Sequence, residues 1–314
     1  MRLAALSVDL DEVPCYTAIH GLPGLETEAR HAVYRKCVPR FESLFDELGI
    51  AATFFVIGRD LADERAADAV RRLQRAGHEL GNHSFDHFYD LTRRDPSVIR
   101  AQIADGLQAI ERAAGVAPVG FRAPGYTITD AVFDVLQELG VRYDSSVFPC
   151  PAYYTAKAAA IASYKLRKRP TQSIVDGLRV LGAPAEPYRV GRPYSEHGQG
   201  LLELPIGVTS DWTARLPYIG TSLIMAGARG AAGLTRLIAG RNLVNLELHG
   251  IDLADAEQDG LEGLAPHQPD LRKPVGDKLA TFRATIDALR DHGYEFVTLA
   301  QAARVFSSIQ RQDH

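Results

Sequence analysis

The chain alternates short β-rich runs with segments of helical periodicity, and this alternation limits the folds open to it. The β-rich runs are LAALSVD (3–9), AATFFVI (51–57), VGFRAP (119–124), VRYDSS (141–146), LLELPIG (201–207), LVNLELH (243–249) and EFVTL (295–299). Helical patterns cover 30–48, 61–76, 97–114, 130–139 and 277–292. Strands that are apolar almost throughout, with helices between them, are typical of a parallel sheet covered by helices. The sequence therefore predicts an α/β fold, either an open sheet or a barrel.

The composition argues against two classes of partner. A net charge of −4 and a pI near 6.2 leave no surplus of basic residues to neutralise phosphates, so nucleic acid is not expected as a partner. No run of 18 apolar residues occurs, so the sequence predicts no transmembrane segment. The basic run KLRKRP (165–170) leaves peripheral contact with anionic headgroups as an alternative to a solvated helix end.

The cysteines and the first residues bear on location. The three cysteines form no C-x-x-C pair, and we expect them to be small buried or surface thiols. MRLAALSVDL (1–10) lacks the long apolar run and the small-residue cleavage site of a signal peptide, and it has the pattern of a strand. Both features favour a reducing, cytoplasmic setting.

The segment HELGNHSFDH (78–87) places two histidines four residues apart at the end of a strand-like run. In one helical turn, or in a tight loop, the imidazoles of His83 and His87 can converge on one metal ion. The alternative is chance, since ten histidines must fall somewhere in 314 residues. Asp86, between them, is not expected to be a ligand.

Charged and histidine side chains collect where other predicted strands end. The first strand ends in SVDLD, and Arg122, Asp144 and His249 lie at or near the ends of three later strands. Residues two apart in a strand point to the same side, so Asp9 and Asp11 can face one site. The carboxyl ends of strands carry the chemistry in such folds. Two histidines and one carboxylate form a familiar zinc ligand set that leaves one position open for water.

These motifs, taken in order, resemble those of polysaccharide deacetylases of the NodB-homology type (carbohydrate esterase family 4). The motifs are SVDLD (7–11), HSFDH (83–87), FRAPGY (121–126), DSSVFP (144–149) and LELH (246–249). The resemblance implies an irregular (β/α) barrel and a metal-dependent hydrolase of linear amide bonds that removes N-acetyl groups from amino sugars. We expect one catalytic domain over residues 1–314, with inserted loops at about 12–29 and 150–200.

The resemblance also implies a role for individual residues. The implied metal ligands are Asp11, His83 and His87, with Asp9 as the catalytic base oriented by Arg122. His249 would be the general acid, with Asp144 as its hydrogen-bonding partner. A backbone N–H following Pro124, near Gly125 and Tyr126, would help to hold the oxyanion, and Leu248 would line the pocket for the acetyl methyl group. The ligand set suits one Zn²⁺, although Co²⁺ and Ni²⁺ accept the same atoms. We expect the guanidinium and the metal to keep the pKa of Asp9 low.

Two features depart from the usual family pattern. Most members have two adjacent aspartates, whereas Leu10 separates Asp9 from Asp11 here. This D-x-D variant occurs in relatives that act on other amides, so a deformylase or ring amidohydrolase is an alternative, and an inactive carbohydrate-binding descendant is a third. The extra segment 12–21 gives Tyr16 and His20 the chance to contact substrate. Segments 12–29 and 150–200 are expected to close over opposite sides of the pocket, which favours small N-acyl amino sugars over long polymers.

Overall fold

The computed structural model describes residues 2–24, 28–175 and 177–312, and within them the strands form one curled sheet. Its strand order is β6-β7-β5-β4-β3-β2-β1-β8, and β9 pairs with the start of β1. The strands are β1 (Leu3–Asp9), β2 (Thr53–Val56), β3 (Glu79–Asn82), β4 (Gly120–Phe121), β5 (Tyr143–Asp144), β6 (Tyr188–Val190), β7 (His197–Glu203), β8 (Leu243–His249) and β9 (Glu295–Phe296). All pairs are parallel except β6 with β7.

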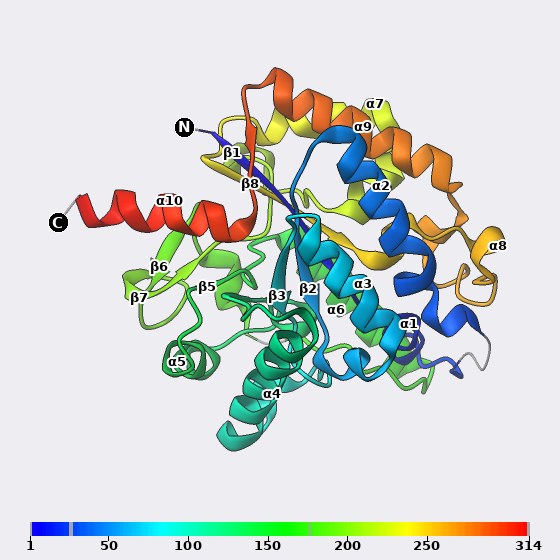
Figure 1. Ribbon diagram of the computed structural model, residues 1–314, viewed down its shortest axis with the longest axis horizontal. Helices are drawn as coiled ribbons and strands as arrows, with labels where there is room; N and C mark the ends of the chain where they lie inside the picture. The colour runs from blue at the N-terminus through cyan, green and yellow to red at the C-terminus, as the bar shows by residue number, and fades with distance from the viewer. Residues whose placement is uncertain (1, 25–27, 176, 313–314) are drawn as a thin grey trace.

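The helices surround this sheet, as Figure 1 shows. They are α1 (Val13–Ile19), α2 (Val38–Leu48), α3 (Glu64–Arg75), α4 (Pro96–Ala114), α5 (Asp130–Glu138), α6 (Pro151–Leu166), α7 (Gly220–Ile238), α8 (Ala256–Asp259), α9 (Val275–Asp291) and α10 (Leu299–Gln312). Helices α7 and α9 pack against each other. Among the described residues, no helix has both the length and the apolar character needed to cross a bilayer.

An irregular segment closes the gap between the two sides of the sheet. After β7, the backbone N–H of Leu204 donates to Asp144, that of Ile206 to Val147, and that of Gly207 to Asn245 of β8. A bridge between Ile219 and Glu247 adds a further link to β8. Parallel strands, covering helices and this non-strand closure together confirm the predicted irregular (β/α) barrel.

Alternation along β1 separates the core from the site. Leu6 and Val8 point into the largest hydrophobic cluster, which also contains side chains from α2 and α9. Ser7 and Asp9 are also buried, but they lie on the opposite face of the strand. The register pairs Asp9 with His249 of β8, so the two predicted catalytic groups end their strands side by side.

The predicted loops at 12–29 and 150–200 contain helices. Both α1 and α6 begin with a proline near their first turn, Pro14 and Pro151, where a missing N–H is tolerated. Helix α6 buries only Tyr154 among its described side chains, so it has no apolar stripe from which a helix could be predicted.

The three cysteines are buried and free, as expected. The ring of His78 is buried, and its Nδ1 accepts a hydrogen bond from the backbone N–H of Ala52.

A buried carboxyl pair lies where β5 and β7 meet, and it generates a stability prediction. Burial, together with the neighbouring charge of Asp144, raises the pKa of Glu203 well above its usual value of 4.5. The proton on Glu203 therefore favours the folded state fully below pH 4.5, and this contribution is lost as the pH rises through the folded-state pKa.

We expect Glu203→Gln, which keeps a donor but cannot titrate, to gain stability relative to the wild type as the pH rises. The difference in the free energy of unfolding should grow by up to about 1.4 kcal/mol per pH unit between the unfolded and folded pKa values. Urea denaturation at several pH values from 4 to about 9 checks this. Parallel pH profiles of the two proteins would contradict it.

Candidate active site

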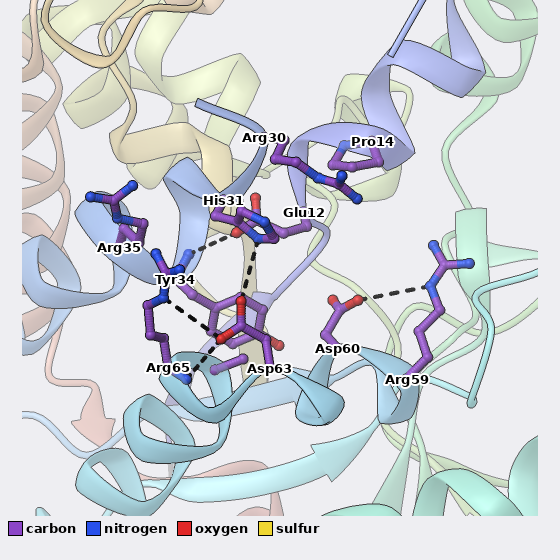
Figure 2. A pocket seen from close by; sticks show the side chains of 11 residues that line it. Glu12, Pro14, Arg30, His31, Tyr34, Arg35, Arg59, Asp60, Asp63 and Arg65 are labelled. Carbon is purple, nitrogen blue, oxygen red and sulfur yellow. Dashed lines mark hydrogen bonds and ion pairs between the residues drawn. The ribbon is translucent and has the colours of Figure 1, made fainter. Parts of the chain in front are cut away.

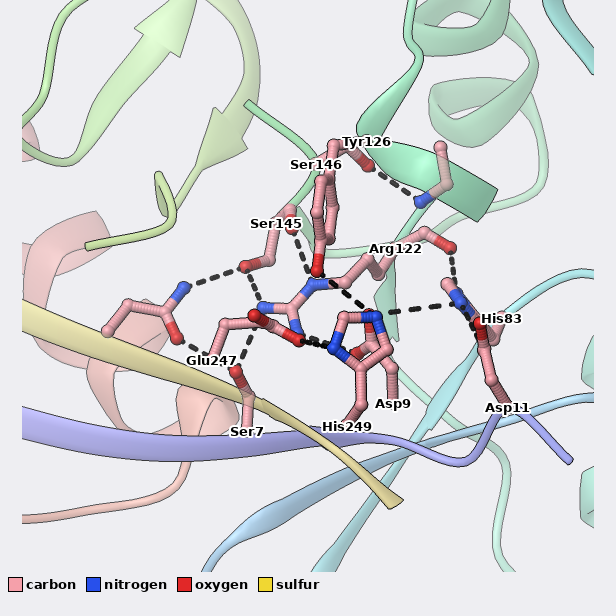
Figure 3. Close-up of polar contacts among 12 residues, drawn as sticks. Ser7, Asp9, Asp11, His83, Arg122, Tyr126, Ser145, Ser146, Glu247 and His249 are labelled. Carbon is pink, nitrogen blue, oxygen red and sulfur yellow. Dashed lines mark hydrogen bonds and ion pairs between the residues drawn. The ribbon is translucent and has the colours of Figure 1, made fainter. Parts of the chain in front are cut away.

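The charged residues predicted from the strand ends meet at one end of the barrel. Asp9 ends β1, His83 follows β3, Arg122 follows β4 and His249 ends β8. Figure 3 shows these side chains converging, with Asp11 beside His83. All except His249 are at least nine-tenths buried.

Three ligand atoms form a triangle of the size that a metal ion requires. The Oδ1 atom of Asp11 lies 3.2 Å from Nε2 of His83 and 3.2 Å from Nε2 of His87. The two Nε2 atoms are also 3.2 Å apart. An ion bound at about 2.0–2.2 Å from each atom would separate them by roughly 3–3.5 Å. Asp11 Oδ1 is buried without a hydrogen-bond partner among the described residues, so the donor set fits a divalent ion.

The surrounding backbone orients these ligands. His83 Nδ1 donates to the carbonyl of Arg122 at 2.7 Å, which leaves the lone pair of Nε2 directed at the triangle. His83 and His87 are joined by a tight loop, in which Ser84 and His87 both have positive φ. The backbone N–H of His87 donates to the Ser84 hydroxyl in that loop. Such strained backbone at two non-glycine residues is typical of functional sites.

Asp9 is held by a buried guanidinium. Its Oδ1 accepts a hydrogen bond from Nη1 of Arg122 at 2.7 Å, and its Oδ2 lies 3.8 Å from Nε2 of His83. Burial raises the pKa of Asp9 despite the opposing charge of Arg122. The low pKa expected from the guanidinium and a metal ion together stays a prediction. Asp11 differs, since the imidazoles of His87 and His83 outweigh its burial and hold its pKa well below the usual value.

A second group, Asp9, Glu247 and His249, also brings three possible ligand atoms together. The guanidinium of Arg122 lies against Asp9 in this group. A second cation there would meet that positive charge at close range. The triangle of Asp11, His83 and His87 is therefore the better metal site.

Glu247, and not Asp144, is the carboxylate that contacts His249. The Oε1 atom of Glu247 lies 2.9 Å from Nδ1 of His249, because residues two apart in β8 share a face. Asp144 instead accepts hydrogen bonds from the N–H and hydroxyl of Ser146 and pairs with Glu203. The prediction that Asp144 is the partner of His249 is wrong. The spacing of Glu247 and His249 in LELH, two residues apart in a strand, could have predicted this contact from the sequence.

One further prediction about the substrate side is wrong. Leu248 lies on the opposite face of β8 from His249 and is buried in the largest hydrophobic cluster, so it does not line the site. Near the predicted oxyanion position, the backbone N–H of Tyr126 donates to the carbonyl of Ala123. An oxyanion contact from the N–H of Gly125, which directly follows Pro124, stays a prediction. The side chain of Tyr126 does reach the site, with its hydroxyl 3.4 Å from Nε2 of His249.

The remaining predicted residues lie around this centre. Pro124 and Gly125 form the short turn before Tyr126, in which Gly125 has a φ of 61° and its carbonyl accepts a hydrogen bond from Lys157. The ring of Tyr16 packs edge-on against that of His249, with centroids 6.2 Å apart. His20, one turn further along α1, instead contacts Tyr164 and Gln268.

The two inserted segments supply walls of aromatic side chains. Tyr16 comes from α1, and Tyr153 comes from α6 and packs against Tyr126 at 5.7 Å. Tyr89, which sequence reasoning missed, packs edge-on against the ring of His87 at 4.7 Å. The three residues of the metal-ligand triangle are buried, and these aromatic side chains pack against His87, His249 and Tyr126.

A separate cavity has a volume of about 450 Å³. Glu12, which directly follows Asp11 in the chain, is one of its lining residues. Figure 2 shows its lining, in which Tyr34, Asp60 and Asp63 lie among arginines and His31. Burial raises the pKa of Glu12 and of Asp60 to about 7. The cavity thus combines buried carboxyl groups with exposed guanidinium groups.

Residues 31–143 match the family model described as polysaccharide deacetylase. The resemblance to polysaccharide deacetylases of the NodB-homology type is confirmed. A peptidoglycan-N-acetylglucosamine deacetylase of Bacillus cereus is 34% identical over 102 residues, which cover 32% of this chain and 46% of that protein. A chitooligosaccharide deacetylase of Bradyrhizobium is 34% identical over 89 residues, covering 28% and 39%. The matches span less than half the length of either relative.

The fold extends the similarity beyond those residues. A solved structure named for a polysaccharide deacetylase from Mycobacterium smegmatis superposes with a TM-score of 0.61 at 20% identity. The alignment covers 98% of this chain and 91% of that one. The shared fold therefore covers nearly the whole chain.

The Glu247–His249 contact generates a prediction about charge. Burial alone would lower the pKa of His249, but the carboxylate of Glu247 raises it well above its usual value. Glu247→Gln removes this charge, so the pKa of His249 in the metal-free protein should fall. NMR titration of the imidazole measures it. Asp144→Asn is the matched control, and a larger shift in that variant would restore Asp144 as the partner.

Proposed function

We propose that this chain is a metal-dependent hydrolase that removes an N-acetyl group from an amino sugar. The observation that carries the proposal is the triangle of Asp11, His83 and His87 beside the buried Asp9–Arg122 pair. The match of residues 31–143 to polysaccharide deacetylases supports the same chemistry. The base, ligands, arginine and acid are all present, which argues against an inactive carbohydrate-binding descendant.

The metal site suits one divalent ion held by Asp11, His83 and His87. Nitrogen and oxygen donors fit Zn²⁺, with Co²⁺ and Ni²⁺ as alternatives. When bound, the ion would polarise the amide carbonyl and acidify a water molecule.

The protein's own residues then move the protons. Asp9 accepts a proton from the attacking water, and Arg122 holds that carboxylate in place. His249 donates a proton to the departing amine nitrogen, because an amine is a poor leaving group unless protonated. Glu247 binds Nδ1 of His249, so the proton on Nε2 faces the substrate. Water thus adds across the amide, giving a carboxylic acid and a free amine.

Small substrates are favoured by the enclosure of the site. Tyr16 of α1 packs against His249, Tyr153 of α6 packs against Tyr126, and Asp9 and His83 are each 1% exposed. A long polymer needs an open groove across the barrel mouth. The proposed substrates are therefore small N-acyl amino sugars, free or carrier-linked. The cytoplasmic location expected from the sequence stays a prediction.

Two substitutions test metal binding and proton transfer separately. His83→Ala should lose bound metal and activity, because one vertex of the triangle is gone. Asp9→Asn should keep the metal and lose turnover by about 10²-fold or more, the usual contribution of a positioned base. Elemental analysis and initial rates measure both, with exposed His197→Ala as the control that retains metal and activity. Full metal occupancy in His83→Ala, or metal loss in Asp9→Asn, would reverse these assignments.

A separate prediction concerns the substrate. We expect release of acetate from N-acetyl monosaccharide derivatives to be faster than from N-acetylglucosamine hexamers, since the site is enclosed. An assay that detects acetate and formate separately, run on N-acetyl, N-formyl and ring-amide substrates, checks it. Faster turnover of hexamers would overturn the size preference. Formate release without acetate release would favour the deformylase alternative raised by the D-x-D spacing.

A further inference from the structure

Two buried tyrosine hydroxyls beside the metal ligands have no hydrogen-bond partner among the described residues. Tyr16 lies on α1 and is 5% exposed, and Tyr89 follows His87 by two residues and is 7% exposed. The hydroxyl oxygens of both are covered by protein. A buried polar atom left unpaired costs about 1–3 kcal/mol, so such atoms need an explanation.

Their positions point to a bound ligand. The ring of Tyr89 stands edge-on to His87, at a centroid distance of 4.7 Å and an interplanar angle of 87°. The ring of Tyr16 stands edge-on to His249 at 6.2 Å. Tyr89 therefore packs against a proposed metal ligand and Tyr16 against the proposed general acid.

One backbone N–H near the expected oxyanion position is already engaged. The N–H of Tyr126 donates to the Ala123 carbonyl, as described above. A phenol with an ordinary pKa of about 10 keeps its proton at neutral pH and is a hydrogen-bond donor. Both tyrosine hydroxyls can therefore add donors to those that the backbone offers.

We propose that Tyr16 and Tyr89 each donate a hydrogen bond to an oxygen atom on the acyl carbon of the substrate. The two oxygens are the former carbonyl oxygen and the one that enters from water. Both tyrosines keep their protons throughout, and they hold the same two oxygens in the carboxylate product. This inference rests on the proposed function and deepens it, because it assigns the groups that recognise the acyl centre.

The test uses Tyr16→Phe and Tyr89→Phe in the full-length, metal-loaded protein. Tyr34→Phe is the matched control. The hydroxyl of Tyr34 is also buried without a partner among the described residues, but Tyr34 lines the neighbouring cavity and not the active site (Figure 2). Each active-site variant should lower kcat by about 10²-fold, the effect of losing one oxyanion donor. The Kd for acetate, measured by calorimetry, should rise by about tenfold. Metal content and Tm should match the wild type or exceed it.

Three results would overturn the inference. Rates and acetate affinities that match those of Tyr34→Phe would remove both hydroxyls from the site. Loss of metal in Tyr89→Phe would make that phenol oxygen a ligand instead of a donor. A fall in Tm without a change in acetate affinity would indicate a structural role. If the wild type cleaves no N-acyl sugar yet acetate binding depends on both hydroxyls, the proposed function fails and this inference stands.

Discussion

The buried ion pair between Arg122 and Asp9 is the interaction on which the geometry of the site depends. Removing a guanidinium from water costs several kcal/mol unless its donors are paired. Arg122 meets this cost with hydrogen bonds to Asp9, to the hydroxyl of Ser7 and to both the carbonyl and hydroxyl of Ser145, and it lies over the ring of Phe55 at 4.3 Å. Its own carbonyl accepts the Nδ1 proton of His83. One residue thus fixes the orientation of both the proposed base and a proposed metal ligand.

The balance of charge around this pair favours a cation at the triangle. Three buried carboxyl groups lie at this end of the barrel, that of Asp11 beside His83 and His87 and those of Asp9 and Glu247 beside His249. Arg122 offsets one of them, and protonated His249 offsets another. Among the described residues, the groups that lower the pKa of Asp11 are the imidazoles of His87 and His83, and these must be neutral to bind metal. A divalent ion held by Asp11 would supply the missing positive charge, which explains why a buried carboxylate with an unpaired oxygen is tolerated there.

The sequence was sufficient for most of this centre because its residues lie in short motifs at strand ends. Asp9 and Asp11 were placed by alternation along β1, and the histidine spacing predicted a shared ligand position. The errors arose where a family role was transferred without applying the same alternation to β8. In that strand His249 and Glu247 face the site, so Leu248 must face the core. Asp144 was misassigned because the sequence does not show that Glu203 lies next to it.

What the sequence could not predict are the walls, because they come from elements outside the repeating strand–helix pattern. Helix α6 has one buried side chain among those described, and α1 is seven residues long, so neither has an apolar period that reveals its position. Both nevertheless bring tyrosines to the site. The strand ends position the reacting groups. Residues such as Asp9 and Arg122 tolerate little change there, because they are buried and hydrogen-bonded to each other. Under the proposed function the inserted segments contact the substrate, and α6 buries a single described side chain, so that helix can vary at lower cost to stability. Under this proposal, the choice of substrate and the chemistry depend on different parts of the fold.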